Sequence, residues 1–332
     1  MSQRAAAIVR MSCAALMVFS CAFVTDALAA SDTQYPTRPI RIVVGFPAGA
    51  SPNDAVARLL GAKLAERFSE QVIVDNRPGA AGTIGSEIVA RAAPDGHTLL
   101  VNSSTLTIAP NAYKNLGFDP ARDLLPITMV ASAPHFIFVH NAVPANNLKE
   151  LIAYVKTQPG KFKFSSGGNG TIPHLAGEML NHMAGLQMVH IPYKGGAPAA
   201  TALLSGEVSM FITTPTGSEA LLYGGKVKVL GVAARTRSPI LPDVPTTEEG
   251  GLPGYELIAW YGVFAPGKTP AHIVQRLYAE IRRIIALPDI KSRFTAMGTE
   301  TADVPPAEFQ RIYLAELQRW AKFVRDTGLK LD

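Results

Sequence analysis

The chain has 332 residues, a formal net charge of +5 at pH 7 and 48% hydrophobic residues. Its basic residues are spread along the sequence and form no run interleaved with aromatics, so we expect no nucleic-acid partner. The slight excess of positive charge suits an anionic ligand. A chain of this length buries about 75% of its unfolded surface and suggests roughly two domains.

The first residues have the layout of a secretory signal peptide. A positive region with Arg4 and Arg10 precedes an apolar run over 11–24, and a small-x-small triplet follows at 27–29. The apolar run is shorter than the about 20 residues that cross a bilayer. We therefore expect a signal peptide over 1–29 and a periplasmic mature protein. A retained membrane anchor and a lipoprotein are the alternatives.

The two cysteines, Cys13 and Cys21, both lie in this segment. The mature chain therefore has no cysteine for a disulfide, a thiolate metal site or a nucleophile. Its fold must be held together by its hydrophobic core. No second stretch of the sequence resembles a membrane span.

Apolar, β-branched runs alternate with helical patterns in the first part of the chain. The run at 40–44 is typical of a buried parallel strand, and 52–68 has the single apolar face of a helix. A strand at 72–74, a helix near 86–92 and a strand at 98–101 follow. This β-α-β-α-β order predicts a doubly wound α/β sheet.

The rest of the chain repeats the pattern. The middle part predicts strands at 135–140, 162–164, 188–190, 208–213 and 227–233, and helices at 148–157, 173–184 and 197–205. The last third predicts one long strand at 255–264 and helices at 271–286 and 306–326.

These elements predict two similar α/β domains joined by two crossing segments. Domain 1 comprises 30–132 and 254–332, because the C-terminal helices return to it, and domain 2 comprises 133–253. Such a layout leaves a cleft between the domains. Open α/β sheets bind ligands beyond the carboxyl ends of their strands, so we expect the site in this cleft.

Small, hydroxyl and glycine residues connect the predicted strand ends to the helix starts. These loops are 46–54, 76–85, 102–105, 165–171, 192–196 and 213–217. Helix N-termini carry unpaired N–H groups and a partial positive charge, so several facing one cleft can hold an anion without a charged side chain. A carboxylate fits better than a phosphate diester or a sugar. Ser51 alone is equally well explained as the N-cap of a helix with Pro52 at its first position.

Catalytic and cofactor motifs are missing or misleading. Residues 262–269 match the phosphate-loop pattern, but Pro266 removes an N–H group that would contact phosphate. There is no nucleophile elbow and no zinc-protease motif, and the histidines form no recognisable ligand pair. We expect no enzyme activity, no cofactor and no metal. His174, which follows a glycine-rich loop, is the histidine that could face the cleft.

A set of short motifs runs through the chain. They are YPTRPI at 35–40, VGFPAG at 44–49, ARLL at 57–60, NRPGAAG at 76–82, PDGHT at 94–98, HLAGE at 174–178, HIPYKGGAP at 190–198 and LPDVPTT at 241–247. With these motifs the chain resembles the tripartite tricarboxylate transporter receptors, or Bug family, over essentially its whole length. The resemblance implies a type II periplasmic-binding-protein fold that closes around a di- or tricarboxylate or a related acid. It also implies a large and a small membrane transporter subunit as partners.

The resemblance also implies which residues contact the ligand. They are Phe46, Ala48, Ala50, Ser51, Gly82, Thr83, Ser104, Gly168, Asn169, Thr171, Tyr193, Thr213 and Thr214. Asp54 stands one residue later than in the family pattern, so the first loop is expected to hold its ligand differently. Lys194 is either a partner for a carboxylate or a solvated surface residue.

The leading interpretation is a monomeric periplasmic receptor that captures a small organic acid for a transporter. The few aromatic residues in the expected site favour an aliphatic acid. The alternatives are an exported ligand sensor that docks on a membrane kinase, and an exported hydrolase or isomerase.

Overall fold

The computed structural model of the protein describes residues 35–49, 51–113, 116–215 and 219–329. The expected signal peptide over 1–29 and Ala50 of the expected site lie outside these residues. The chain divides into two compact units, 1–37 and 38–332, and the helices and strands described below belong to the second unit. Within the described part of the chain, no helix is both long and apolar enough to cross a membrane.

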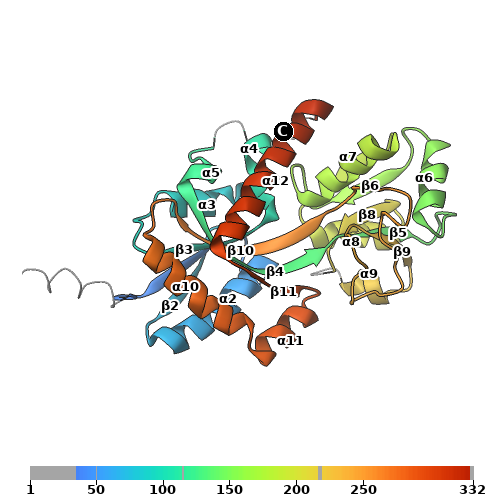
Figure 1. Ribbon diagram of the computed structural model, residues 1–332. Coiled ribbons are helices and arrows are strands. Elements are labelled where there is room, and N and C mark those ends of the chain that lie inside the picture. The colour runs from blue at the N-terminus through green and yellow to red at the C-terminus, as the bar shows by residue number, and fades with distance from the viewer. Residues whose placement is uncertain (1–34, 50, 114–115, 216–218, 330–332) are drawn as a thin grey trace, which may run out of the picture. The chain divides into compact units, whose positions relative to one another are not determined.

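The first sheet has the strand order β11-β4-β10-β3-β1-β2 (Figure 1). The strands are β1 (Ile40–Val44), β2 (Val72–Asn76), β3 (Thr98–Ser103), β4 (Leu124–Pro134), β10 (Ile258–Pro266) and β11 (Glu300–Val304). β1 is parallel to both of its neighbours, β2 and β3. β10 is antiparallel to β3 and β4, and β11 is antiparallel to β4. The sheet is therefore parallel at one end and antiparallel at the other.

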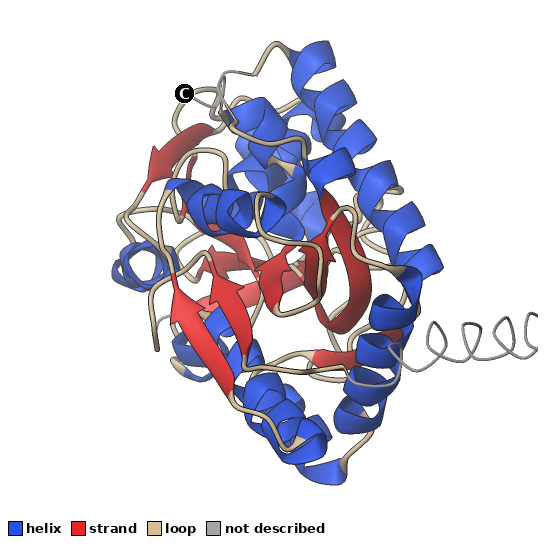
Figure 2. Ribbon diagram, turned by 90° about the vertical axis from the view of Figure 1, so that its left-hand side faces the viewer, coloured by secondary structure: helices blue, strands red, loops and turns tan. Residues whose placement is uncertain are grey.

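Helices lie on both sides of these strands (Figure 2). They are α2 (Pro52–Phe68), α3 (Thr83–Ala90), α4 (Ala109–Ala112), α5 (Pro120–Asp123), α10 (Ala271–Ile285), α11 (Pro288–Ala296) and α12 (Pro306–Thr327). α2 packs against α10. α3 and α12 share a core with Trp260 and Phe264 of β10. Gly262 permits this packing, because a Cβ there would lie 2.4 Å from the ring of Phe309.

The second sheet has the strand order β7-β6-β8-β5-β9. The strands are β5 (Phe136–His140), β6 (Lys163–Ser166), β7 (Val189–Pro192), β8 (Met210–Thr213) and β9 (Val227–Val232). Its helices are α6 (Leu148–Lys156), α7 (Ile172–Ala184), α8 (Gly196–Ser205) and α9 (Glu219–Tyr223). β6 is parallel to both β7 and β8, whereas β5 is antiparallel to β8 and β9.

One hydrophobic core joins the second sheet to segments that flank the first. Ile108, just before α4, and Trp320 of α12 belong to the same buried cluster as Leu175 of α7. Tyr255 is also buried in this cluster, and its hydroxyl donates to Ala176 O at 2.8 Å. Parts of the chain far apart in sequence are thus packed into one interior.

The structure confirms the predicted α/β class with two sheets, and α2 has the predicted bounds. β4 is a strand that the sequence analysis does not predict. It contains Pro126, and proline within an apolar run normally argues against a paired strand. The phosphate-loop pattern is not a loop, since Gly262 to Pro266 lie within β10. The division into domains 30–132 with 254–332 and 133–253 stays a prediction.

Candidate ligand-binding site

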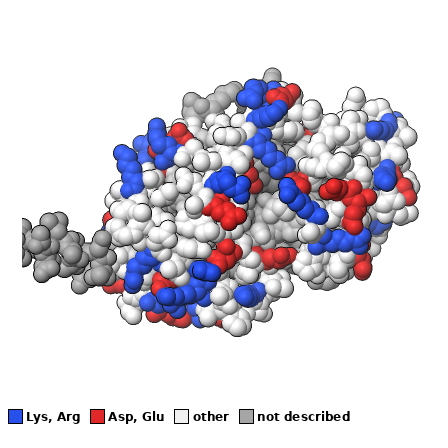
Figure 3. Space-filling model, viewed as in Figure 1, with Lys and Arg blue, Asp and Glu red and all other residues white. Residues whose placement is uncertain are grey.

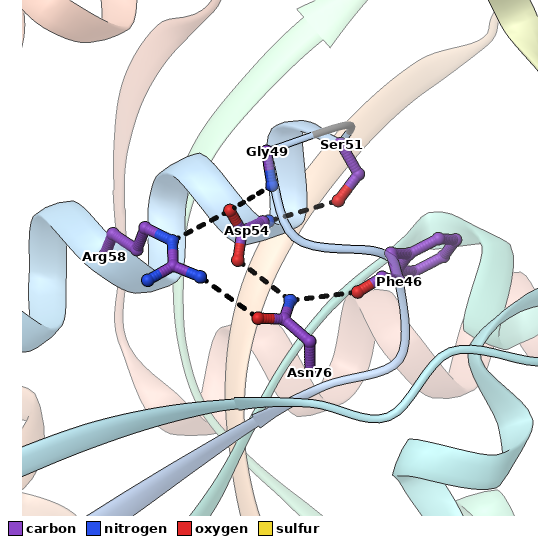
Figure 4. Close-up of polar contacts among 6 residues, drawn as sticks. All are labelled: Phe46, Gly49, Ser51, Asp54, Arg58 and Asn76. Carbon is purple, nitrogen blue, oxygen red and sulfur yellow. Dashed lines mark hydrogen bonds and ion pairs between the residues drawn. The ribbon is translucent and has the colours of Figure 1, made fainter.

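The loop between β1 and α2 is organised around the carboxyl group of Asp54 (Figure 4). Asp54 Oδ2 accepts hydrogen bonds from Gly49 N at 2.8 Å and from Arg58 Nε at 2.9 Å. Asp54 Oδ1 accepts from Asn76 Nδ2 at 2.8 Å, and this amide also donates to Phe46 O at 2.9 Å. Asn76, the last residue of β2, is therefore bonded to the start and the end of the loop that follows β1.

The carboxyl group of Asp54 is buried, with 2% of the residue exposed. Burial by itself would raise its pKa, but hydrogen bonds from Arg58, Gly49 and Asn76 and the charge of Arg58 outweigh burial and lower the pKa. The carboxylate is therefore ionised at neutral pH and paired with Arg58. These hydrogen bonds and the ion pair hold the loop to the start of α2 and to the end of β2.

Ser51 is the N-cap of α2, and its Oγ accepts from Asp54 N at 3.2 Å. Pro52 occupies the first turn, as the capping interpretation predicts. Ala48 is exposed and Phe46 is half-buried, so both side chains can meet solvent or a ligand.

The loop between β2 and α3 has an uncommon backbone conformation. The four residues Gly79–Gly82 all have positive φ angles, between 45° and 136°. Gly82 lies against Gly45, where a Cβ would be 2.5 Å from Gly82 Cα, so the loops after β1 and β2 meet backbone to backbone. The hydroxyl of Thr83 donates to Ala80 O at 2.9 Å and is engaged within this loop.

The loop after β3 is tied to the same place by a buried chain of hydrogen bonds. Asn102 Nδ2 donates to Ser86 Oγ at 2.9 Å, and Ser86 Oγ donates to Gly82 O at 2.9 Å. Asn102 Oδ1 accepts from Ser103 N at 2.8 Å. Ser104, the next residue, is 3% exposed. The carboxyl ends of β1, β2 and β3 therefore form one connected cluster of loops.

The loop between β6 and α7 contributes from the second sheet. Gly168 has a φ of 127°, and Thr171 Oγ1 donates to Gly168 O at 2.7 Å. Asn169 is exposed. Gly195 N donates to Gly167 O at 3.2 Å, so the loops after β6 and β7 lie side by side.

Four further expected residues lie at the end of β8 or just after β7 and β8. The hydroxyl of Tyr193 donates to Glu207 Oε1 at 2.9 Å, and burial together with Glu207 raises the pKa of Tyr193 to about 12. Lys194 is exposed. Thr213 ends β8, and both Thr213 and Thr214 are 8% exposed.

The loops of the two sheets approach each other where α4 meets the start of α7. A Cβ on Gly170 would lie 3.0 Å from the Cβ of Ala112. Ile108 and Ile172, on the two sides of this contact, belong to the same core. The segment after Ser104 therefore packs against the glycine-rich loop of the second sheet.

The expected site residues thus fall into two groups at strand ends. Sequence reasoning missed Asn76, Ser86 and Asn102, which join the first three loops. A signal for two of them exists, because each asparagine lies at or near the end of an apolar run that predicts a strand. The sequence contains no comparable signal that the hydroxyls of Thr83, Thr171 and Tyr193 are bonded within the protein.

Charge is neutralised or dispersed around these loops. Arg58 pairs with Asp54, and Arg77 pairs with Asp75 at 3.0 Å. Acidic and basic side chains are interspersed on the face shown in Figure 3. In the described ranges no group of three or more His, Cys, Asp or Glu side chains could hold a metal ion.

Comparisons with known proteins agree with this architecture. The profile of the tripartite tricarboxylate transporter family receptor matches residues 56–329. The structure of the periplasmic binding protein BugD is 36% identical with a TM-score of 0.76, and the alignment covers 89% of this chain and 99% of BugD. R. palustris Rpa4515 with adipate is 31% identical with a TM-score of 0.79, covering 90% and 99% of the two chains. MatC from Rhodopseudomonas palustris with bound malate is 32% identical with a TM-score of 0.76, covering 87% and 100%.

Proposed function

Because the chain belongs to the tripartite tricarboxylate transporter receptor family, we propose that it captures a small carboxylate for a membrane transporter. Members of this family are periplasmic solute-binding receptors and not enzymes. In this proposal the mature protein is exported by the signal peptide over 1–29. Its partners are the large and small membrane subunits of the transporter.

The convergence of the loops after β1, β2 and β3 carries this proposal. Gly45 and Gly82 touch through their backbones, and Asn76 and Asn102 bind the loops together. The starts of α2 and α3 are thereby brought to one place, where the helix dipoles favour an anion. Arg58 is paired with Asp54 in the first of these loops.

The proposed ligand is an aliphatic dicarboxylate or a similarly small organic acid. Two solved relatives contain adipate and malate, which are compact aliphatic acids. Phe46 is a half-buried aromatic residue in the first loop, and the hydroxyl of Tyr193 is occupied by Glu207. In the proposal, one carboxylate is bound by Phe46, Ala48, Ala50, Ser51, Gly82, Thr83 and Ser104. The opposite wall comprises Gly168, Asn169, Thr171, His174, Tyr193, Lys194, Thr213 and Thr214.

A thermal-shift screen of the exported protein tests the proposal. The panel contains mono-, di- and tricarboxylates, aromatic acids, amino acids and sugars. A ligand at 100 times its dissociation constant stabilises the folded state by about 2.7 kcal/mol, so a specific acid gives a clear increase in Tm. Stabilisation by a sugar alone, or by none of the acids, would contradict the proposal. The intact mass of the same sample shows whether residues 1–29 have been removed.

A matched pair of glycine variants tests the position of the site. Gly168→Ala and Gly160→Ala both place a side chain at a positive φ, 127° and 73°, and Gly160 lies outside the proposed site with nothing within 4 Å of its Cβ position. Both variants are expected to lose stability, and only Gly168→Ala is expected to lose affinity for the acid found in the screen. Equal affinities for the two variants would exclude the loop after β6 from the site.

A further inference from the structure

A stack of three rings lies beside the glycine-rich loop 167–171. The imidazoles of His174 (α7) and His190 (β7) are stacked with centroids 3.9 Å apart and planes 13° apart. The ring of Phe164 (β6) stacks against His190 at 5.0 Å and 28°. The stack joins β6, which precedes the loop, and β7 to the helix α7 that follows the loop.

Both imidazoles are bonded to the loop or to the residue before it. His174 Nδ1 accepts a hydrogen bond from Gly170 N at 3.2 Å. His190 Nε2 lies 2.6 Å from Ser166 Oγ. Ser166 Oγ in turn lies 3.1 Å from Gly168 N and 3.0 Å from Gly168 O.

One proton arrangement satisfies all these contacts. Ser166 has one proton, which goes to Gly168 O, and its two lone pairs accept from Gly168 N and from a protonated His190 Nε2. Gly170 N is a donor, so His174 Nδ1 must be unprotonated and the neutral ring carries its proton on Nε2. Ser166 is fully buried, and its contact with His190 is therefore structural and does not activate a nucleophile.

The loop depends on these contacts for its shape. Gly168 and Gly170 have φ angles of 127° and 70°, which residues with a Cβ rarely adopt. Glycine can adopt many other conformations as well, so this loop needs contacts that hold it in this one. The side chains of Ser166, Thr171 and His174 make hydrogen bonds to the backbone of this loop.

We propose that His174 and His190 are positioning residues that hold the loop 167–171 in its ligand-binding geometry, with the neutral ring of His174 as the acceptor for Gly170. This inference rests on the proposed function, because it assigns a support to one wall of that site. The two histidines act through the loop and need not touch the ligand.

Two variants at His174 separate ring stacking from hydrogen bonding. His174→Phe keeps an aromatic ring in the stack and removes the acceptor for Gly170 N. His174→Asn places an amide oxygen close to the position of Nδ1 and restores the acceptor. The matched control is His140→Phe, because His140 Nδ1 accepts from Ala142 N at 3.2 Å in a turn away from the loop.

The readouts are the hydrogen-exchange rate of the Gly170 amide without ligand and the affinity for adipate and malate. A lost hydrogen bond corresponds to roughly tenfold in an equilibrium constant. His174→Phe is therefore expected to speed exchange at Gly170 and weaken binding about tenfold. His174→Asn is expected to restore slow exchange at Gly170, and His140→Phe is expected to stay within about threefold of the parent protein in both measurements. Unchanged exchange and affinity in His174→Phe would overturn the inference. Absence of acid binding in the parent protein would instead count against the proposed function, and the exchange measurement would still decide on the loop.

A pH profile provides a test that does not need the phenylalanine variant to fold. Burial lowers the pKa of His174 to about 4. Its ionisable neighbours are His190, which stacks on it, and Glu178, which lies one turn further along α7. Protonation of His174 Nδ1 opposes Gly170 N–H, so affinity should fall more steeply in the parent protein than in His174→Asn as the pH is lowered from 7 to 4. Ligand protonation affects both proteins equally. Parallel profiles would contradict the role of His174.

Discussion

The indole N–H of Trp260 donates to Glu316 Oε2 at 2.8 Å and joins β10 to α12. Thr107, which follows Ser104 in the third loop, has its hydroxyl 3.5 Å from the same carboxylate oxygen and donates to Ser104 O at 2.7 Å. The carboxyl group of Glu316 thus lies where the last helix, a strand of the first sheet and a loop of the proposed site meet.

Glu316 should make stability depend on pH near neutrality. Burial raises its pKa to about 7, against the opposing effect of the bond from Trp260. A group with a raised folded-state pKa stabilises the fold at low pH, and this contribution is lost as the pH rises through about 7. The Tm of the parent protein is therefore expected to fall relative to Glu316→Gln between pH 5 and pH 8. Glu308→Gln, at an exposed position of the same helix, is the control. A constant difference across this range would show that Glu316 is not protonated in the folded state.

Asp54→Asn should destabilise the protein. It replaces the carboxylate that accepts hydrogen bonds from Gly49 N and Arg58 Nε, and it removes the negative charge that pairs with Arg58. We expect a loss of about 1–3 kcal/mol in urea unfolding, together with weaker acid binding. Glu249→Gln, which breaks the exposed pair with Arg237, should cost much less, because solvent screens an exposed pair. Equal losses for the two variants would mean that the Asp54 network adds nothing beyond an exposed ion pair.

Gly45→Ala should disturb the contact between the first two loops. The added Cβ would lie 2.5 Å from Gly82 Cα, so the backbone must move. Overpacking of this kind typically costs about 1–3 kcal/mol, and we expect acid affinity to fall with it. Gly196→Ala is the control, because nothing lies within 4 Å of its Cβ position. A Gly45→Ala variant with unchanged stability and affinity would show that the close approach is not required.

Tyr193→Phe should leave acid affinity nearly unchanged, because its hydroxyl is bonded to Glu207. We expect a stability loss of about 0.5–1.5 kcal/mol from this hydrogen bond. Calorimetric titration with the acid identified in the screen measures the affinity, and Glu207→Gln serves as the matched control. A loss of affinity of tenfold or more in Tyr193→Phe alone would indicate that the hydroxyl turns to the ligand.

Much of the fold could be predicted, because local sequence patterns indicate most of its helices and strands. Helix α2 has a serine cap, a proline in its first turn and one apolar face, and its predicted bounds agree with the structure. The glycine- and hydroxyl-rich strand ends likewise indicate where the loops converge. Strand β4 is not predicted, because Pro126 within its apolar run normally argues against a paired strand.

The hydrogen bonds within the site are harder to predict from the sequence than the position of the site. The hydrogen bonds of Thr171 and His174 are local, but the contact of His190 with Ser166 and its stacking on His174 are set by tertiary structure. The hydroxyl of Thr171 is as suitable for a ligand as for Gly168 O when only the sequence is known. The stack of His174 on His190 joins a helix to a strand 16 positions further along the chain, and no periodicity reports such a pair.

The place of β10 between β3 and β4 has a consequence for how the protein is made. During synthesis, β1, β2, β3 and β4 leave the ribosome long before β10, so the first sheet has a missing central strand until residue 266 has been added. The facing edges of β3 and β4 stay unpaired while the whole second sheet is translated. An unpaired apolar edge can pair with other chains. Export of the chain in an unfolded state would postpone formation of the first sheet until all of its strands are present.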